Sequence, residues 1–294
     1  MEEIIFKKAE ILVEALPYIQ KYKGKLFVIK MGGSIFRNQD VKKSILMDVA
    51  FLNAVGINVL LVCGGGPFIT EEIEKTGKKV EFIEGLRVTN KEELEIVVKV
   101  LGNVKNEIKD ILETQFNTCC TGFNPEDRIV LAKKIHWQKG DEVIDLGYVG
   151  QITGVDIPKI ESQITRGVVI IAPIGISEEG QLYNINGDSV SAYISQIMKA
   201  EKLIFLTSVP GIMRNISNPD ALISILTVEQ AEGLIKDNII QHGMIPKTKA
   251  CISSLKEGVK KTHIISGTIS HALLFEIFTQ QGIGTEIILS EQNE

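Results

Sequence analysis

Two lysines and one aspartate stand where turns of the chain are expected, and these side chains are the best suited to chemistry. Four apolar residues run into Lys30, and Gly32 and Gly33 follow closely. This pattern is typical of a buried strand that ends in a tight turn, at the edge where open α/β sheets bind ligands. Lys247 and Asp188 stand at the starts of expected helices. Taken alone, Lys30 is equally consistent with an exposed lysine at a strand end.

A second glycine turn follows the next expected strand. The apolar run 57–63 leads directly into Gly64, Gly65, Gly66 and Pro67, and a helix is expected from about residue 68. A strand, a glycine turn and a helix start together aim backbone N–H groups and the positive end of the helix at an anion. A triple glycine could also be no more than a tight turn. Two such turns after successive strands favour a cleft that binds phosphate.

The chemistry that fits these residues is phosphoryl transfer. It needs positive charge on the phosphoryl oxygens and in-line positioning more than it needs covalent help from the protein. Two lysines oriented by a carboxylate, together with glycine amides, would supply both. The sequence contains no GxxxxGK[ST], no GxGxxG after a strand and no GxSxG motif, which excludes the common P-loop, dinucleotide and hydrolase signatures.

Expected strands and helices alternate along the whole chain. Strands are predicted at 26–31, 57–63, 129–131, 148–152, 168–171, 203–206, 263–265 and 285–289. Helices are predicted between them, a long one after Thr89 or Asn90, others at 228–236 and 270–279, and an additional amphipathic helix at 3–22. This alternation predicts an α/β fold with an open, mainly parallel central sheet sandwiched by helices. The helix at 3–22 belongs to no βα unit, so it packs either on its own chain or on another subunit.

Composition narrows the class of protein. The 294 residues are 44% hydrophobic and 23% charged, with a formal net charge of −5, which gives no general argument for nucleic acid or an anionic membrane as partner. No apolar run approaches a membrane span, and the N-terminus has no signal-peptide pattern. Four cysteines without CxxC spacing and four histidines predict no metal site, reduced thiols and a cytoplasmic protein.

Seven motifs, in this order and spacing, resemble those of the amino-acid kinase superfamily, and within it the N-acetylglutamate kinases. The resemblance covers nearly the whole chain. The motifs lie at 29–33, 63–67, 85–89, 148–150, 183–188, 206–211 and 243–247. Each is weak alone, whereas their order and spacing together are specific.

The resemblance implies ATP-dependent phosphorylation of the side-chain carboxylate of N-acetyl-L-glutamate, an early step of arginine synthesis, with Mg²⁺ on the phosphates. Lys30 and Lys247 would hold the transferring phosphoryl group, and Asp188 would orient both lysines. The remaining site residues implied are the amides of Gly33, Gly65 and Gly66, the substrate-binding Arg87 and Asn184, and a nucleotide loop of Thr207, Ser208, Val209, Pro210, Gly211 and Met213.

The N-terminal helix resembles that of the hexameric, arginine-inhibited members of the superfamily. In those members the helices of neighbouring dimers interlock. The resemblance implies an L-arginine site at Tyr18, Lys202, His263, Glu276 and Gly282, and the alternative of a structural histidine at a strand start stays open for His263. It also implies three parts: an oligomerisation helix at 1–22, an acyl-substrate lobe at 23–178, and a nucleotide lobe at 179–294.

The sequence departs from the family pattern around the expected cleft. Cys63 replaces a usual histidine before the glycines, Ser208 replaces an aspartate, Lys23 replaces an aromatic residue, and 121–127 lacks a glycine-lysine turn. Two alternatives therefore stay open: a related kinase for a carrier-bound aminoadipate or glutamate, and a non-catalytic arginine sensor. Intact Lys30, Asp188 and Lys247 favour an active enzyme.

Overall fold

The structure is a computed structural model that describes residues 2–139, 142–214, 221–241, 243–279 and 282–290. Its centre is an eight-stranded sheet in the order β14-β16-β15-β13-β1-β2-β10-β5. The strands are β1 (Leu26–Met31), β2 (Asn58–Cys63), β5 (Cys120–Gly122), β10 (Val168–Ile171), β13 (Lys202–Thr207), β14 (Ile225–Thr227), β15 (Lys261–Ser266) and β16 (Thr285–Ile288). All pairs are parallel except β15 with β16, so the mainly parallel sheet predicted from the sequence is confirmed.

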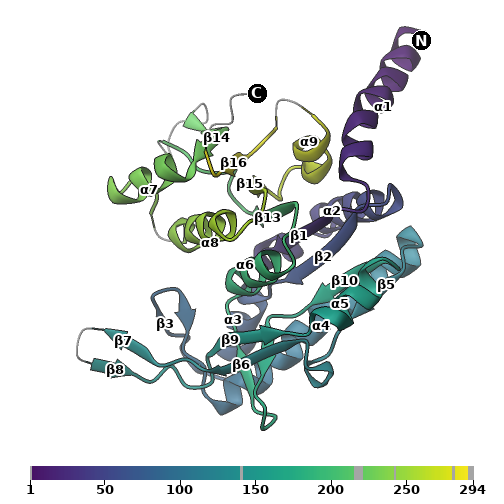
Figure 1. Cartoon of the computed structure of the whole chain (residues 1–294). Coiled ribbons are helices and arrows are strands. Elements are labelled where there is room, and N and C mark those ends of the chain that lie inside the picture. The colour runs from purple at the N-terminus through teal and green to yellow at the C-terminus, as the bar shows by residue number, and fades with distance from the viewer. Residues whose placement is uncertain (1, 140–141, 215–220, 242, 280–281, 291–294) are drawn as a thin grey trace.

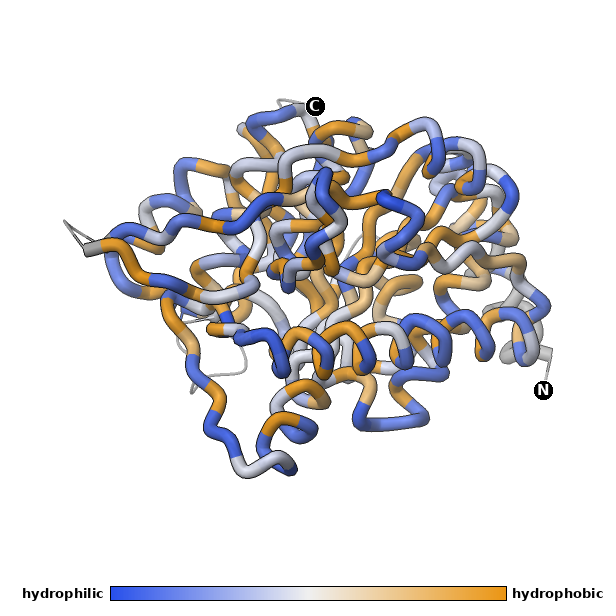
Figure 2. Tube along the Cα trace, turned by 90° about the horizontal axis from the view of Figure 1, so that it is seen from below, coloured by the Kyte–Doolittle hydropathy of each residue, from blue (hydrophilic) through white to orange (hydrophobic). Residues whose placement is uncertain are grey.

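Helices cover both faces of this sheet (Figure 1). The core on one face joins the sheet to α2 (Gln39–Ala54), α3 (Gly66–Lys75), α4 (Lys91–Phe116) and α9 (Ala272–Phe278). The core on the other face joins it to α5 (Ile157–Ile164), α6 (Gly187–Ile197), α7 (Val228–Lys236) and α8 (Met244–Lys256). Figure 2 shows the hydrophobic positions gathered along the inner strands and the hydrophilic ones towards the outside.

The helix α1 (Glu2–Tyr22) precedes the first strand and projects away from the body of the molecule towards the N-terminus (Figure 1). Its C-terminal end packs on the core through Tyr22, which is buried, and through Tyr18 and Ile19. Val13 and Leu16 further out are exposed. No helix among the described residues is long and apolar enough to cross a membrane.

Smaller β elements accompany the large sheet. A four-stranded sheet has the order β12-β11-β6-β9, with β6 (Val130–Lys134), β9 (Gly150–Val155), β11 (Ile174–Ile176) and β12 (Leu182–Asn184). Two hairpins pair β3 (Phe82–Ile83) with β4 (Leu86–Arg87), and β7 (Trp137–Lys139) with β8 (Glu142–Ile144). Two short 3₁₀ helices lie at Gly33–Arg37 and Pro125–Asp127.

Most predicted elements are confirmed within one or two residues, because strong local signals fix them. Asn90 caps α4, with its side chain on the Glu93 N–H and the Glu93 carboxylate on the Asn90 N–H. The motif at 85–89 precedes the long helix and contains no predicted strand, but the structure has one there. Arg87 is on β4, paired with Phe82, because a two-residue turn at Glu84 and Gly85 with positive φ at both closes a hairpin.

Candidate functional site

The predicted cleft is present at the carboxyl ends of β1 and β2. It is a cavity of about 380 Å³ whose lining includes both glycine turns and residues from β4, β12, α6 and α8. The structure brings together every residue predicted for catalysis and for the acyl substrate, which are Lys30, Gly33, Gly65, Gly66, Arg87, Asn184, Asp188 and Lys247.

Asp188 joins the two lysines. Its Oδ1 lies 2.9 Å from the Lys30 Nζ, and its Oδ2 accepts a hydrogen bond of 2.7 Å from the Lys247 Nζ. Side chains alternate along a strand, so Lys30 shares its face of β1 with Val28, whose core lies on the side of α6 and α8. This alternation aims Lys30 at the helix that carries Asp188.

The local electrostatics keep the Asp188 carboxylate ionised. Burial opposes its charge, but Lys30 and Lys247 outweigh burial, so the pKa of Asp188 falls below its usual value. Asp188 is also in the first turn of α6, where the helix dipole favours an anion, and Asn186 caps the same helix. Two ammonium groups thus share one carboxylate, which leaves one positive charge in excess among these three side chains.

The two glycine turns touch one another. A Cβ on Gly33 would lie 2.7 Å from the Pro67 Cδ and 2.9 Å from the Gly66 N, so no larger residue fits without moving the turns apart. Within the described ranges, the N–H groups of Gly33, Gly65 and Gly66 donate to no backbone carbonyl. They are therefore available to anionic oxygens in the cavity.

Arg87 presents a buried cation with spare hydrogen-bonding capacity. Its Nη2 donates to the Gly66 carbonyl at 3.0 Å and to the Thr70 hydroxyl at 2.9 Å. Its Nη1 is buried and has no partner in the described part of the protein. The guanidinium stacks on the Phe82 ring, 4.6 Å from its centroid, and burial lowers its pKa. A carboxylate of a ligand would satisfy the free Nη1.

A second cavity adjoins the first. Its volume is about 680 Å³, and its lining is mainly apolar. All six residues predicted for the nucleotide loop line it, and Thr207, Ser208 and Lys247 line both cavities. Six further residues line this cavity. Ile212 lies within the predicted loop, and Gly243 and Met244 belong to the motif at 243–247. The sequence reasoning missed the other three, Ile239, Ile240 and Gln241, because no sequence pattern in the segment before α8 separates cavity-lining from core residues.

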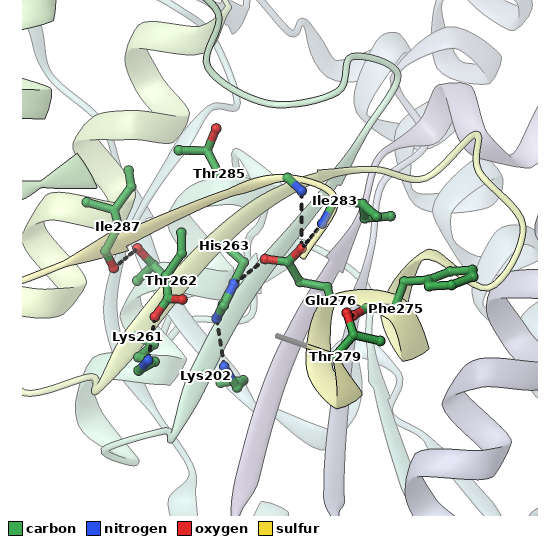
Figure 3. Close-up of polar contacts among 12 residues, drawn as sticks. Lys202, Lys261, Thr262, His263, Phe275, Glu276, Thr279, Ile283, Thr285 and Ile287 are labelled. Carbon is green, nitrogen blue, oxygen red and sulfur yellow. Dashed lines mark hydrogen bonds and ion pairs between the residues drawn. The ribbon is translucent and has the colours of Figure 1, made fainter. Parts of the chain in front are cut away.

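A second polar cluster lies on the other face of the sheet, where β13 and β15 meet α9 (Figure 3). The Lys202 Nζ lies 2.8 Å from the His263 Nε2, and the His263 Nδ1 lies 2.7 Å from the Glu276 Oε1. The second oxygen of Glu276 accepts from the N–H groups of Ile283 and Gly284. Burial lowers the pKa of Lys202 to about 8, and burial and then Lys202 lower the pKa of His263.

Four of the five residues predicted for arginine therefore lie together. Gly282 is beside Glu276, since a Cβ there would lie 3.1 Å from the Glu276 Oε2. Tyr18 instead packs edge-on against Phe278 of α9. The Lys202 Nζ lies over the ring of Tyr22, 5.3 Å from its centroid, and the sequence reasoning missed this residue. Its place in the last turn of the amphipathic helix was the available signal.

The departures from the family pattern have separate environments. Cys63 is fully buried at the end of β2, its Sγ donates to the Ile171 carbonyl at 3.6 Å, and burial raises its pKa to about 12. It is therefore a neutral core thiol. Ser208 is exposed where the two cavities meet.

The sequence profile described as the amino acid kinase family matches residues 25–266. The chain belongs to this family. Among curated relatives of this amino acid kinase, the acetylglutamate kinase of Methanocaldococcus jannaschii is 46% identical over 96% of this chain and 97% of its own length. The acetylglutamate kinase of Caldanaerobacter subterraneus is 43% identical over 95% of this chain and 93% of its own length. The family expected from the sequence is confirmed.

Solved structures agree on the fold. The N-acetylglutamate synthase from Neisseria gonorrhoeae, complexed with coenzyme A and L-arginine, superimposes with a TM-score of 0.85 at 25% identity. The alignment covers 96% of this amino acid kinase but only 65% of the synthase chain. Carbamate kinase from Giardia lamblia bound to AMP-PNP gives a TM-score of 0.62 at 18% identity. The alignment covers 90% of this chain and 98% of the carbamate kinase chain, and it shows a shared fold alone.

Proposed function

We propose that this chain transfers the γ-phosphoryl group of ATP to the side-chain carboxylate of N-acetyl-L-glutamate. Relatives named acetylglutamate kinase, 40–46% identical over nearly the whole chain, support this activity. The observation that carries it is the position of Lys247, which lines both cavities and shares Asp188 with Lys30. A phosphoryl group crossing from one cavity to the other would pass between the two ammonium groups.

In the proposed reaction, a substrate carboxylate oxygen forms a bond to the γ-phosphorus while the bond from that phosphorus to the bridging oxygen breaks. ADP leaves with the electron pair, and the product is an acyl phosphate. Lys30 and Lys247 balance the negative charge that spreads over the phosphoryl oxygens and the leaving oxygen. Asp188 fixes both lysines in place before substrates arrive, which avoids reorganisation during the reaction.

The acyl-substrate cavity supplies complementary groups for the other end of N-acetylglutamate. The unpartnered Arg87 Nη1 would bind the α-carboxylate as a charge-assisted hydrogen bond. The Asn184 side chain would bind the acetamido group. The amides of Gly33, Gly65 and Gly66 would bind the reacting carboxylate and the phosphoryl oxygens.

Members of a kinase family that uses ATP need a divalent cation, and we propose Mg²⁺ here. Asp188 is already paired with two lysines, and the described residues hold no cluster of three or more histidine, cysteine, aspartate or glutamate side chains. The phosphate oxygens of ATP would therefore carry the ion, which enters as part of the nucleotide substrate. The cytoplasmic location expected from the sequence stays a prediction.

A hydroxamate assay tests the activity, because hydroxylamine traps an acyl phosphate as a coloured ferric complex. The full chain is incubated with ATP and Mg²⁺ and with N-acetylglutamate, glutamate or 2-aminoadipate in parallel. We expect colour with N-acetylglutamate alone. A faster reaction with either free amino acid would favour a related kinase, and no reaction with any acceptor would refute the kinase proposal.

We also propose inhibition by L-arginine at the Lys202, His263 and Glu276 cluster. The carboxylate of Glu276 is a charge partner for a guanidinium group, and the similar synthase structure is of a complex with L-arginine. We expect millimolar L-arginine to slow the reaction and Glu276→Gln to weaken the inhibition at least tenfold. Unchanged rates of the wild-type chain at these concentrations would contradict the proposal.

The N-terminal helix supports a further proposal, a hexamer in which α1 interlocks between dimers. Val13 and Leu16 are exposed apolar side chains on this projecting helix and would be covered by such contacts. We expect the full chain to behave as a hexamer in light scattering and a chain lacking residues 1–22 to behave as a dimer. A hexamer that survives the deletion would contradict the interlocking role.

A further inference from the structure

The hydroxyl of Thr89 lies between the two residues proposed to hold the non-reacting end of the substrate. Thr89 is completely buried. Its Oγ1 donates to the Arg87 carbonyl at 2.7 Å, and the Asn184 Nδ2 donates to the same Oγ1 at 3.0 Å. One side chain thus connects β4 to β12, although Arg87 and Asn184 are almost one hundred residues apart.

The direction of these hydrogen bonds is fixed by chemistry. A hydroxyl has one proton, and a carbonyl oxygen can only accept. The Thr89 proton is therefore used on the Arg87 carbonyl, and its oxygen must accept from the next group. Asn184 can satisfy it only with its NH₂, since its carbonyl oxygen in that position would face the Thr89 lone pairs.

This polarity sets which atom of Asn184 is available to a ligand. Asn184 lines the acyl-substrate cavity, and within the described residues its Oδ1 receives no hydrogen bond from protein. We propose that Thr89 is a positioning residue that turns the Asn184 carbonyl toward the cavity, where it accepts the N–H of an acylated amine. This inference rests on the proposed function and adds the source of its selectivity.

The main chain holds the same arrangement. The Tyr148 N–H donates to the Thr89 carbonyl at 2.7 Å, and the Asn184 N–H donates to the Tyr148 carbonyl at 2.9 Å. Gly147 has a φ of +71°, and a Cβ there would lie 2.2 Å from the Thr89 carbonyl oxygen. The motif at 148–150 has no proposed contact with substrate. Its backbone at Tyr148 is hydrogen-bonded to both Thr89 and Asn184 and so holds these two residues together.

The test uses a substrate pair that differs at one atom. N-acetylglutamate is compared with 2-acetoxyglutarate, the ester in which oxygen replaces the amide N–H, in the wild-type chain and in Thr89→Val and Thr89→Ser. We expect wild type and Thr89→Ser to prefer the amide at least tenfold in kcat/KM, because the ester oxygen would face the Asn184 carbonyl. Thr89→Val keeps the shape but loses the hydroxyl, and its preference should fall below about threefold.

Comparing the two substrates in each variant distinguishes a positioning role of Thr89 from a merely structural one. A merely structural role of Thr89 would lower kcat/KM equally for the amide and the ester in Thr89→Val, and that result would overturn the inference. Equal use of both substrates by the wild-type chain would also overturn it. Turnover of N-acetylglutamate by the wild-type chain is the separate measurement that decides the proposed function.

Discussion

Two lysine clusters lie on opposite faces of the same sheet, and their lysines are on the neighbouring strands β1 and β13. Lys30 is near the carboxyl end of β1 and points to the face of α6 and α8, whereas Lys202 begins β13 on the face of α9. In the first cluster two lysines share one carboxylate beside a cavity. In the second, one lysine, one histidine and one glutamate satisfy each other while almost fully buried.

The two clusters differ in how much charge and how many hydrogen-bond donors remain without a partner. The Lys30 cluster keeps an excess positive charge and free N–H groups next to open volume, so it is ready for an anion. The charges of the Lys202 cluster compensate one another. Burial nevertheless disfavours the charged form of Lys202 and lowers its pKa. Incomplete compensation beside a cavity therefore marks the Lys30 cluster as the place for the chemical step.

The largest expected effect comes from removing the shared cation. Lys247→Ala should lower kcat at least a hundredfold, since the loss of one preorganised charge donor costs about 3 kcal/mol in the transition state. The measurement is the hydroxamate rate at saturating substrates. Lys256→Ala on the same helix, which removes an exposed lysine paired with Glu232, is the matched control and should keep the wild-type rate. A near-normal rate for Lys247→Ala would contradict the claim that the uncompensated charge of the Lys30 cluster serves the reaction.

A smaller effect is expected from separating the glycine turns. Gly33→Ala places a Cβ 2.7 Å from the Pro67 Cδ, so the turns must move apart and the free amides shift with them. We expect a fall in kcat/KM of about tenfold. Gly102→Ala in α4, where an added Cβ meets nothing within 4 Å, should leave kcat/KM unchanged. Equal effects of the two substitutions would contradict a specific role for the touching turns.

The last expected effect is on stability rather than on rate, at the second cluster. The pKa of Lys202 falls from its usual 10.5 to about 8 in the folded chain, so between these values the folded state binds fewer protons than the unfolded state, and stability rises with pH. Lys202→Met should lack this rise. The difference in free energy of unfolding between wild type and Lys202→Met should change by about 2 kcal/mol from pH 7.5 to pH 10.

Urea titrations at several pH values measure this difference. Lys256→Met, which removes an exposed lysine, is the control and should follow the wild-type curve. Parallel curves for wild type and Lys202→Met would show that burial does not shift the titration of Lys202.

Local signals made much of the fold and of the cleft predictable. Strand β10 and helix α7 were predicted with their observed bounds, because a short apolar run and a capping threonine mark their limits. Lys30, Asp188 and Lys247 were found because glycine turns and helix starts have recognisable sequence patterns. Thr89 was predicted only to precede a helix and to end the motif at 85–89, because its contacts come from residues 147–148 and 184, which no local pattern connects to it. Ile239, Ile240 and Gln241 of the second cavity could not be predicted for the same reason, because no local pattern distinguishes them from core residues.

The order of strands has a consequence for the time at which this site can form. Strand β1 pairs with β2, which follows within the next few dozen residues, but its other neighbour is β13, whose first residue is made roughly 170 residues later. At about 5 to 20 residues per second, a ribosome needs roughly 10 to 30 s to cover that interval. Throughout it, one edge of the strand that carries Lys30 has no hydrogen-bonding neighbour from β13. Asp188 and Lys247 also arrive late, so the catalytic charges meet only when synthesis is nearly complete.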